Sequence, residues 1–186
     1  VWRDVQINLI DTPGQVDFSA EVERSLRVLD CAVLVLSAVE GIQAQSGPIW
    51  EALEALGIPV LVFVNKIDRM GSDALGICAE VQRVFSLDAV LVNGVENEGG
   101  DEAVVAELTP KQYGELTEQV AEQDDALLER YLEGEALERE VVEAGLAQAT
   151  RARRLFPVLC GAAKNRVGIE ALLDAIVDYL PAANTD

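Results

Sequence analysis

Short, continuously apolar runs separated by amphipathic segments are the feature of this sequence that most constrains its fold. Three such runs lie at residues 31–36, 59–64 and 157–160. Each has the length of a strand and lacks the polar alternation of a strand with one wet face, so each is expected to be covered on both faces of a sheet. Helical patterns separate the runs, and this alternation predicts an α/β fold with a mostly parallel sheet and helices on both faces.

The other predicted elements follow from periodicity and from turn residues. Residues 5–10 alternate apolar with polar side chains, as a strand does, and Val22, Leu26 and Leu29 recur at helical spacing. Pro48 stands in the first turn of a predicted helix, and Gly57 stands where a left-handed cap would end it. Outside the acidic region described below, these elements are a strand at 5–10, helices at 17–29, 46–57, 73–85 and 169–180, a short strand at 89–92, and a turn or loop at 93–100.

An acidic helical region is predicted between the third and the last apolar runs. Thr109 and Gln112 have the spacing of a capping box, with Pro110 at the first helical position, and open a helix that extends to about residue 134. A second helix is predicted at 135–153. Leu127, Leu128, Tyr131 and Leu132 form the expected packing side. The acidic face is interpreted as solvated, with a partner surface as the alternative.

Charge and composition exclude several functions. With 14 basic and 33 acidic residues the net charge is -19, which predicts no direct nucleic-acid binding by this chain. No apolar run reaches the roughly 20 residues of a membrane span, and no signal pattern opens the sequence, so a cytoplasmic location without membrane contact is expected. Histidine is absent, which excludes His-based triads and His-ligated zinc. Reduced core thiols are predicted for Cys31, Cys78 and Cys160, and core positions for Trp2, Trp50, Phe63 and Phe85.

Three loops that follow predicted strands carry the residues that are candidates for ligand binding. Their sequences are Asp11-Thr12-Pro13-Gly14, Asn65-Lys66-Ile67-Asp68 and Gly161-Ala162-Ala163-Lys164. Ligands of open parallel sheets bind outside the carboxyl ends of the strands, where these loops lie. Taken singly, the second tetrapeptide is equally well explained as a solvated loop with a helix cap, and the first as a plain turn. Their occurrence in order at three buried strands favours a binding site.

The second and third loops contain groups that suit guanine. A carboxylate at Asp68 can accept from the two adjacent donors of the base, N1–H and the exocyclic amine, a pair that adenine lacks. Asn65 suits N7 and the joining of neighbouring loops. The aliphatic stems of Lys66 and Lys164 can cover the two faces of the base. The backbone N–H of Ala163, next to Ala162, is expected to point at O6.

The first loop suits phosphate chemistry. Asp11 can hold Mg²⁺ through a water molecule, and the amide of Gly14 can approach a terminal phosphate oxygen where a side chain would clash. Gln15 comes next and can orient an attacking water. Gly14 and Gln15 are therefore the candidate catalytic positions, and Asp11 is the candidate metal ligand.

These residues resemble the G domain of translational GTPases of the elongation factor G type. The resemblance rests on the DTPGQVDF sequence at 11–18, on EVERSLRVLD at 21–30 and on NKIDRMG at 65–71, and it extends over nearly the whole chain. The LSAVEGIQAQ sequence at 36–45, together with residues 57–59, is closer to tetracycline-resistance ribosomal protection proteins. The resemblance implies a P-loop NTPase fold, GTP/GDP and Mg²⁺ binding, and GTP hydrolysis stimulated by the ribosome.

The sequence departs from the family pattern at three points. The glycine-rich phosphate loop and the switch segment, which the family carries before the strand at Val5, are absent, so residues 1–186 are interpreted as a partial G domain with residues 93–153 as a helical insertion. Gln15 replaces the catalytic histidine of the family. Ala162 replaces a serine, which removes one side-chain hydrogen bond.

Two functions from different classes are therefore predicted. The first is the guanine-nucleotide-binding domain of a ribosome-associated GTPase, with hydrolysis only in a complete parent protein. The alternative is a non-catalytic module that retains the scaffold and docks a basic protein partner through its acidic helices. A truncated chain with a free strand edge is also expected to be capable of strand exchange into a dimer.

Overall fold

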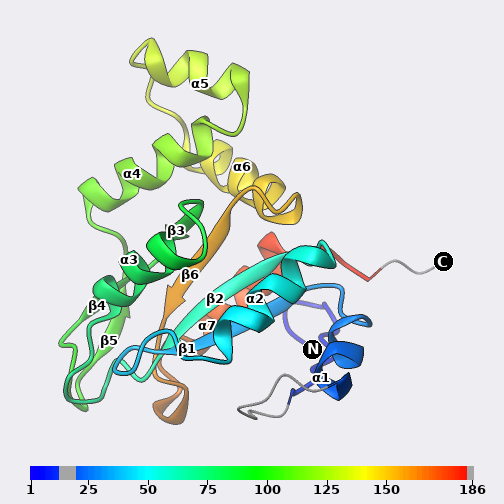
Figure 1. Ribbon diagram of the computed structural model, residues 1–186. Helices are drawn as coiled ribbons and strands as arrows, with labels where there is room; N and C mark the ends of the chain where they lie inside the picture. Colours follow the sequence, from blue (N-terminus) through cyan, green and yellow to red (C-terminus); the bar gives the residue numbers. More distant parts are fainter. Residues whose placement is uncertain (13–19, 184–186) are drawn as a thin grey trace.

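The computed structural model describes residues 1–12 and 20–183, and this part of the chain forms an α/β fold (Figure 1). Its main sheet has four strands in the order β1-β2-β6-β3. All three neighbouring pairs are parallel. The strands are β1 (Ala32–Ser37), β2 (Val60–Asn65), β6 (Phe156–Cys160) and β3 (Ala89–Leu91). The predicted fold class is confirmed.

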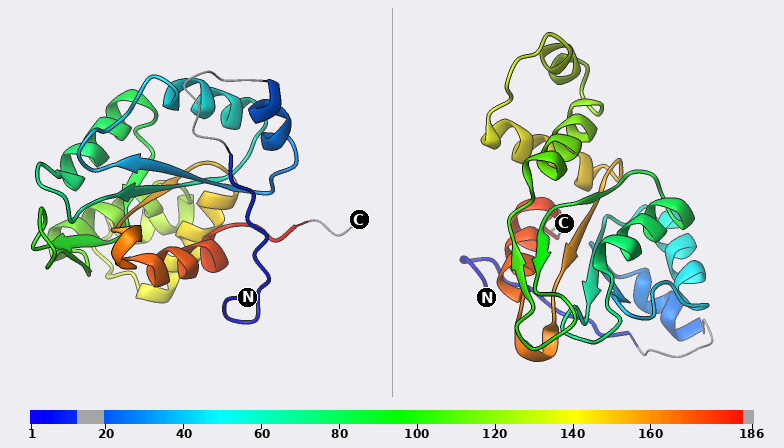
Figure 2. Two further views of the ribbon diagram at one scale, coloured as in Figure 1. Left: turned by 90° about the horizontal axis from the view of Figure 1, so that it is seen from below. Right: turned by 90° about the vertical axis from the view of Figure 1, so that its left-hand side faces the viewer.

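Helices cover both faces of this sheet, as the left-hand view of Figure 2 shows. One face carries α1 (Ala20–Leu26), α2 (Ser46–Ala55) and α3 (Ala74–Val84). The other face carries α4 (Pro110–Ala121), α6 (Arg139–Arg151) and α7 (Ile169–Tyr179). A further helix, α5 (Asp125–Leu132), projects beyond the sheet and contains no buried residue. The sheet is therefore the middle layer of three.

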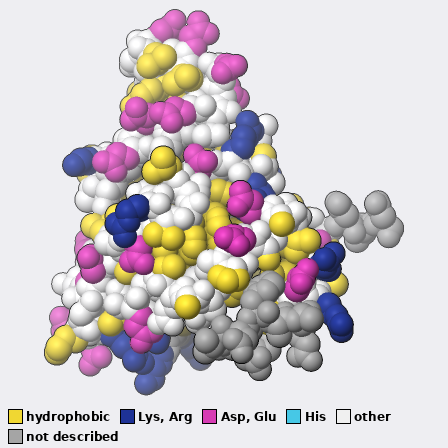
Figure 3. Space-filling model, viewed as in Figure 1, with side chains coloured by type: hydrophobic (Ala, Val, Ile, Leu, Met, Phe, Trp, Pro, Cys, Tyr) yellow, Lys and Arg dark blue, Asp and Glu magenta, His cyan; other side chains and the backbone are white. Residues whose placement is uncertain are grey.

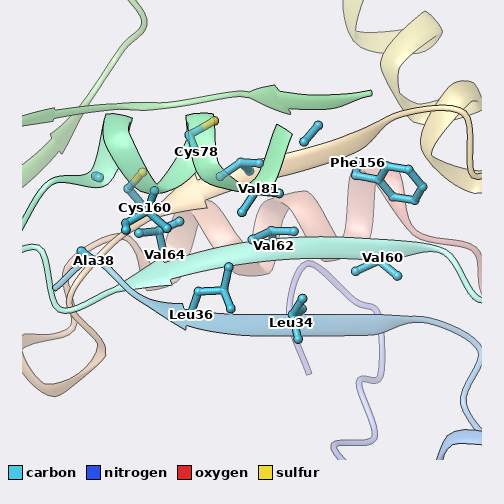
Figure 4. Packing of buried hydrophobic residues seen from close by; sticks show 14 of the residues in the cluster. Leu34, Leu36, Ala38, Val60, Val62, Val64, Cys78, Val81, Phe156 and Cys160 are labelled. Atoms are coloured by element: carbon cyan, nitrogen blue, oxygen red, sulfur yellow. The ribbon is translucent and has the colours of Figure 1, made fainter. Parts of the chain in front are cut away.

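The apolar runs are continuous because alternate side chains fill two separate cores. Val60, Val62 and Val64 of β2 pack in the cluster under α1, α2 and α3, and Figure 4 shows them beside residues of β1. Leu61 and Phe63 point to the opposite cluster under α4, α6 and α7. Successive residues of a strand face opposite sides of its sheet, so a strand buried on both faces has no polar position.

The aromatic residues divide between the core and the surface. The Trp50 ring stacks on Phe85 at 5.0 Å between centroids and meets Phe156 edge-on at 4.9 Å. Phe63 is also buried. Trp2 is half-buried, and its Nε1–H donates to Asp174 Oδ1 of α7 at 2.8 Å. Trp2 therefore attaches the N-terminal segment to the outside of a helix, instead of filling the interior.

Residues 5–10 do not form the predicted strand. Val5 makes only an isolated antiparallel bridge with Trp2, while Leu9 and Ile10 are 88% and 46% exposed. Arg3, just before this segment, forms ion pairs with Asp174 and Asp178 of α7. A strand requires backbone hydrogen bonds to a neighbour, and the backbone of residues 6–12 forms none with the described residues. Alternation alone was therefore an insufficient signal.

The predicted loop at 93–100 contains half of a β-hairpin. β4 (Gly94–Glu96) pairs antiparallel with β5 (Val104–Ala106) in a separate two-stranded sheet. The turn between them has positive φ angles at Asn97 and Gly99, which explains its glycine and asparagine content. Val95 and Val105 pack against the core cluster below α3. The polar composition of this segment correctly predicted the turn, and the two short strands on either side of it were not predicted.

The predicted helix from 109 to 134 is two helices. Thr109 and Gln112 form the predicted capping box at the start of α4. The chain then breaks at Asp124, whose side chain accepts from the N–H groups of Ala126 and Leu127 to begin α5. Gly134, with a positive φ of 81°, ends α5. The next helix starts at Arg139 and not at residue 135, with the extended residue Glu138 as its N-cap. The predicted packing side of α5 is wrong at Leu132, which is 74% exposed.

All three cysteines are free thiols, with Cys78 and Cys160 buried in the core (Figure 4) and Cys31 half-buried. Burial raises the pKa of the Cys78 thiol to about 11 and the pKa of the Cys160 thiol to about 12. Both thiols are therefore protonated at neutral pH and are not nucleophiles. In the described part of the chain, no helix combines the length and the apolarity that crossing a membrane requires.

Two helical glycines are expected to respond to alanine with opposite signs. A Cβ at Gly145 of α6 would lie 2.6 Å from Val120 Cγ1 of α4, whereas a Cβ at Gly114 of α4 would meet nothing within 4 Å. Gly145→Ala is expected to lower the free energy of unfolding by about 1–2 kcal/mol through overpacking. Gly114→Ala is expected to raise it by about 0.5–1 kcal/mol through helix propensity. Urea unfolding monitored by circular dichroism measures both, and equal shifts would contradict the close α4–α6 contact.

Candidate functional site

Two of the three predicted loops leave the sheet side by side. β2 and β6 are parallel neighbours, with Val64 opposite Cys160 at their carboxyl ends. The segment Asn65-Lys66-Ile67-Asp68 follows β2, and the segment Gly161-Ala162-Ala163-Lys164 follows β6 and leads into a 3-10 turn, η1 (Ala163–Asn165). We call them the 65–68 loop and the 161–165 loop. Strand order alone therefore brings their side chains to one edge of the sheet, as predicted.

Hydrogen bonds join the two loops directly. The Ala163 N–H donates to Asn65 Oδ1 at 2.9 Å, and Asn165 Nδ2 donates to Asp68 Oδ2 at 2.8 Å. The backbone N–H of Ile67 donates to the carbonyl of Gly161 at 3.2 Å. Asn65 thus provides the predicted link between neighbouring loops. Because side chains of each loop bond to the other, the two loops form one unit.

The 65–68 loop is anchored at its third residue. Ile67 is fully buried in the core, while Asn65, Lys66 and Asp68 are half-buried at the surface. Lys66 has a φ of 72°, in the left-handed region. This change in backbone direction lets Ile67 enter the core while its polar neighbours stay at the surface. Ile67, the one residue of this loop without a predicted role at the base, is therefore the residue that fixes the loop to the core.

The 161–165 loop is closed by backbone bonds. The Ala162 N–H donates to the Val167 carbonyl at 2.9 Å, and the Val167 N–H donates to the Ala162 carbonyl at 3.0 Å. Ala162 is 1% exposed, whereas Ala163 and Lys164 are exposed. A small closed turn thus presents Ala163, Lys164 and Asn165 on its outer side.

The β4–β5 hairpin supports the 65–68 loop from the other side, which sequence reasoning missed. The Gly99 N–H donates to the Ile67 carbonyl at 2.8 Å. Glu98 Oε1 accepts from Ser72 Oγ at 2.5 Å and from the Ala74 N–H at 2.6 Å, at the start of α3. A carboxylate among the turn residues was the only sequence signal for this contact.

A polar hollow of about 210 Å³ lies beside the 65–68 loop, at the carboxyl ends of β1 and β2. Its lining includes Ser37, Glu40, Gln43, Asn65 and Lys66. A larger hollow of about 590 Å³ lies between α4, α5 and α6. None of the predicted site residues lines the larger hollow. The smaller hollow adjoins the 65–68 loop, and Asn65 and Lys66 of that loop line it.

The phosphate side of the predicted site is described only at Asp11 and Thr12. Asp11 is exposed and forms no hydrogen bond or ion pair with the described residues. Gly14 and Gln15 lie outside the described residues. Within residues 1–12 and 20–183, no group of three or more His, Cys, Asp or Glu side chains could hold a metal ion.

Two groups that were predicted to contact a base already have partners. The Ala163 N–H is bonded to Asn65, so donation to a base carbonyl requires this bond to be shared or opened. Asp68 Oδ2 accepts from Asn165, while Asp68 Oδ1 accepts no hydrogen bond from the described residues. Asn165 was not among the predicted site residues. The sequence feature that could have identified Asn165 is its side-chain amide. This amide is a hydrogen-bond donor three positions after Ala162, a residue that has no hydroxyl to donate.

Two comparisons with known proteins find relatives of this chain. The family model described as the elongation factor Tu GTP binding domain matches residues 1–182. Among solved structures, a protein from Thermus thermophilus superposes with a TM-score of 0.80 at 28% sequence identity, over 92% of this chain. The match covers 30% of the Thermus chain, so the present chain spans less than a third of that protein.

Proposed function

This chain belongs to the family of elongation factor Tu GTP-binding domains, and on that premise we propose that it recognises guanine nucleotide in a ribosome-associated GTPase. The observation that carries the proposal is the joining of the 65–68 and 161–165 loops by hydrogen bonds at Asn65 and Asp68. This junction places a half-buried carboxylate, an amide side chain and a backbone N–H at one edge of a parallel sheet. Ligands bind at that edge in open α/β folds.

The donor and acceptor pattern at this junction suits guanine. Asp68 supplies a carboxylate with one oxygen, Oδ1, free of the described residues. Guanine offers two adjacent donors to such a group, and adenine offers no equivalent pair, so Asp68, once covered by a bound base, would reject adenine. Lys66 and Lys164 are proposed to cover the faces of the base with their stems, and the Ala163 N–H to donate to O6.

Mg²⁺ and the phosphates are proposed to lie on the Asp11 side. A single carboxylate without a competing partner fits Mg²⁺, which retains several waters and takes few protein ligands beside substrate phosphates. When bound, the ion would neutralise charge on the phosphate oxygens. Asp11 would hold it through water, the Gly14 amide would approach a phosphate oxygen, and Gln15 would orient the attacking water. Hydrolysis is proposed for the complete parent protein.

A finer assignment within the family is also proposed. The sequence at 36–45 favours the type of tetracycline-resistance ribosomal protection proteins over elongation factor G itself. The ribosome would then be the partner of the parent protein. This assignment rests on sequence similarity in a segment that lines the polar hollow, at Ser37, Glu40 and Gln43.

Nucleotide competition tests the proposal. A fluorescent guanine nucleotide is titrated into the full-length protein and displaced with GTP or ATP. The full-length protein is expected to prefer GTP by about 100-fold or more, because a site that reads both donors of guanine leaves buried groups unpaired with adenine. Equal displacement by GTP and ATP from the full-length protein would refute guanine recognition.

A second candidate is a non-catalytic module that docks a basic partner. The exposed acidic residues of the α5 region favour it, among them Asp125, Glu129 and Glu133. Figure 3 shows acidic side chains gathered at the end of the molecule formed by α5. The same titration separates the two candidates, since a docking module requires no preference for GTP.

A further inference from the structure

We propose that Asn165 is a positioning residue that holds the Asp68 carboxylate in the orientation needed to read guanine. The inference rests on the proposed function, because it assigns a role within the same site. Its observation is the bond from Asn165 Nδ2 to Asp68 Oδ2 at 2.8 Å, which joins residues 97 positions apart.

The backbone around Asn165 is held in place by its own turn. The Asn165 N–H donates to the Ala162 carbonyl at 3.1 Å, and the next residue, Arg166, adopts a left-handed φ of 59°. The Ala162–Val167 pair of bonds closes the turn on both sides. The Asn165 side chain therefore projects from a fixed base, and its amide can restrain what it bonds.

Asp68 has no other restraint of this kind in the described part of the chain. No ion pair with Lys66 or Lys164 is present there, and buried Ala162 offers only a methyl group. A carboxylate turns freely about its last bond, and two-point contact with a base requires both oxygens to lie in the plane of the base. A donor on one oxygen removes this freedom before the nucleotide arrives.

An amide is a suitable group for this task. A carboxylate has about four lone-pair sites, and the Asn165 amide occupies one of them on Oδ2. Two donors of a base can still be accepted. A lysine or arginine in this position would hold the carboxylate more strongly and would also compete with the base through its charge. Asn165 orients Asp68 and leaves its negative charge available.

The test compares Asn165→Ala and Asn165→Asp with wild type in the full-length protein, using GTP and inosine triphosphate. Inosine lacks the exocyclic amine, so it makes one contact with Asp68 where guanine makes two. Asn165→Ala is expected to weaken GTP binding about five- to tenfold and to reduce the GTP-to-inosine-triphosphate preference. Asn165→Asp is expected to lose more, because a second carboxylate beside Asp68 repels it.

Glu170→Ala is the matched control. Glu170 is exposed in the first turn of α7, five positions from Asn165, and has no side-chain bond to the described residues. Its nucleotide preference is expected to equal that of wild type. Because Asn165 is exposed, its variants are expected to keep the wild-type melting temperature, which circular dichroism checks. In an Asp68→Asn background, Asn165→Ala is expected to add little to the loss of GTP binding.

The outcomes separate this inference from the proposed function. An unchanged GTP-to-inosine-triphosphate ratio in Asn165→Ala overturns the positioning role while the wild-type preference for GTP over ATP stands. Tighter GTP binding by Asn165→Ala also overturns it, since Asn165 would then be a competitor for Asp68. A wild-type protein without preference for GTP over ATP overturns both proposals.

Discussion

The Asp68→Asn variant of the full-length protein is expected to lose about 100-fold or more of its preference for GTP over ATP. An asparagine presents one acceptor and one donor where guanine offers two donors, so one of its groups faces the base with the wrong polarity. Hydrogen bonds to charged groups contribute about 1.5–3 kcal/mol each, which sets the size of the effect. Competition titration with GTP and ATP measures it.

Asp73→Asn is the control for the lost charge. Asp73 lies five positions away and caps α3, where its side chain accepts from the Gly76 N–H. Asparagine caps helices as well as aspartate does, so this variant removes one charge without changing the fold. It is expected to retain the wild-type preference for GTP. An equal loss in both variants would mean that net charge, and not the position of Asp68, controls selectivity.

Gly161→Ala is expected to lower the free energy of unfolding by about 2–4 kcal/mol and to impair nucleotide binding as well. A Cβ at Gly161 would lie 2.4 Å from the Val167 carbonyl oxygen and 2.7 Å from Phe63 Cζ. The Val167 carbonyl cannot retreat without breaking its bond to the Ala162 N–H. Gly161 also accepts from the Ile67 N–H, so the disturbance reaches both loops of the candidate site.

Gly47→Ala provides the comparison. Gly47 lies in α2, and a Cβ there would meet nothing within 4 Å. Alanine is therefore expected to be neutral or stabilising at this position. Urea unfolding of both variants isolates the cost of the close approach at Gly161. A Gly161→Ala protein as stable as Gly47→Ala would show that the backbone at the end of β6 tolerates a side chain.

Several elements were predictable because their signals are local. The capping box at Thr109 joins residues within one helical turn. The left-handed φ of 67° at Gly57 likewise depends on the end of the helix just before it. The runs that became β1, β2 and β6 were recognisable because burial on both faces excludes polar residues. The break at Asp124 had a local signal too, an aspartate suited to capping, and a longer helix was predicted across it.

Two other errors concern elements that depend on a distant partner. Residues 5–10 alternate as a strand does, yet the described residues place no strand beside them, and Trp2 and Arg3 bond to α7 instead. The β4–β5 hairpin was missed for the opposite reason. Its strands are only three residues long, and an alternation of that length does not predict a strand. Pairing with each other and core contacts at Val95 and Val105 stabilise them.

The sequence by itself determined the strand–helix alternation, the edge of the sheet where the candidate site lies, and the residue types of the 65–68 and 161–165 loops. These follow from hydrophobic periodicity and from turn residues, which act over a few positions. Only the tertiary structure decided that Asn65 bonds to Ala163 and that Asn165 bonds to Asp68, across 98 and 97 positions of sequence. Such bonds exist because β2 and β6 are neighbours in the sheet, and strand order is a property of the folded chain as a whole.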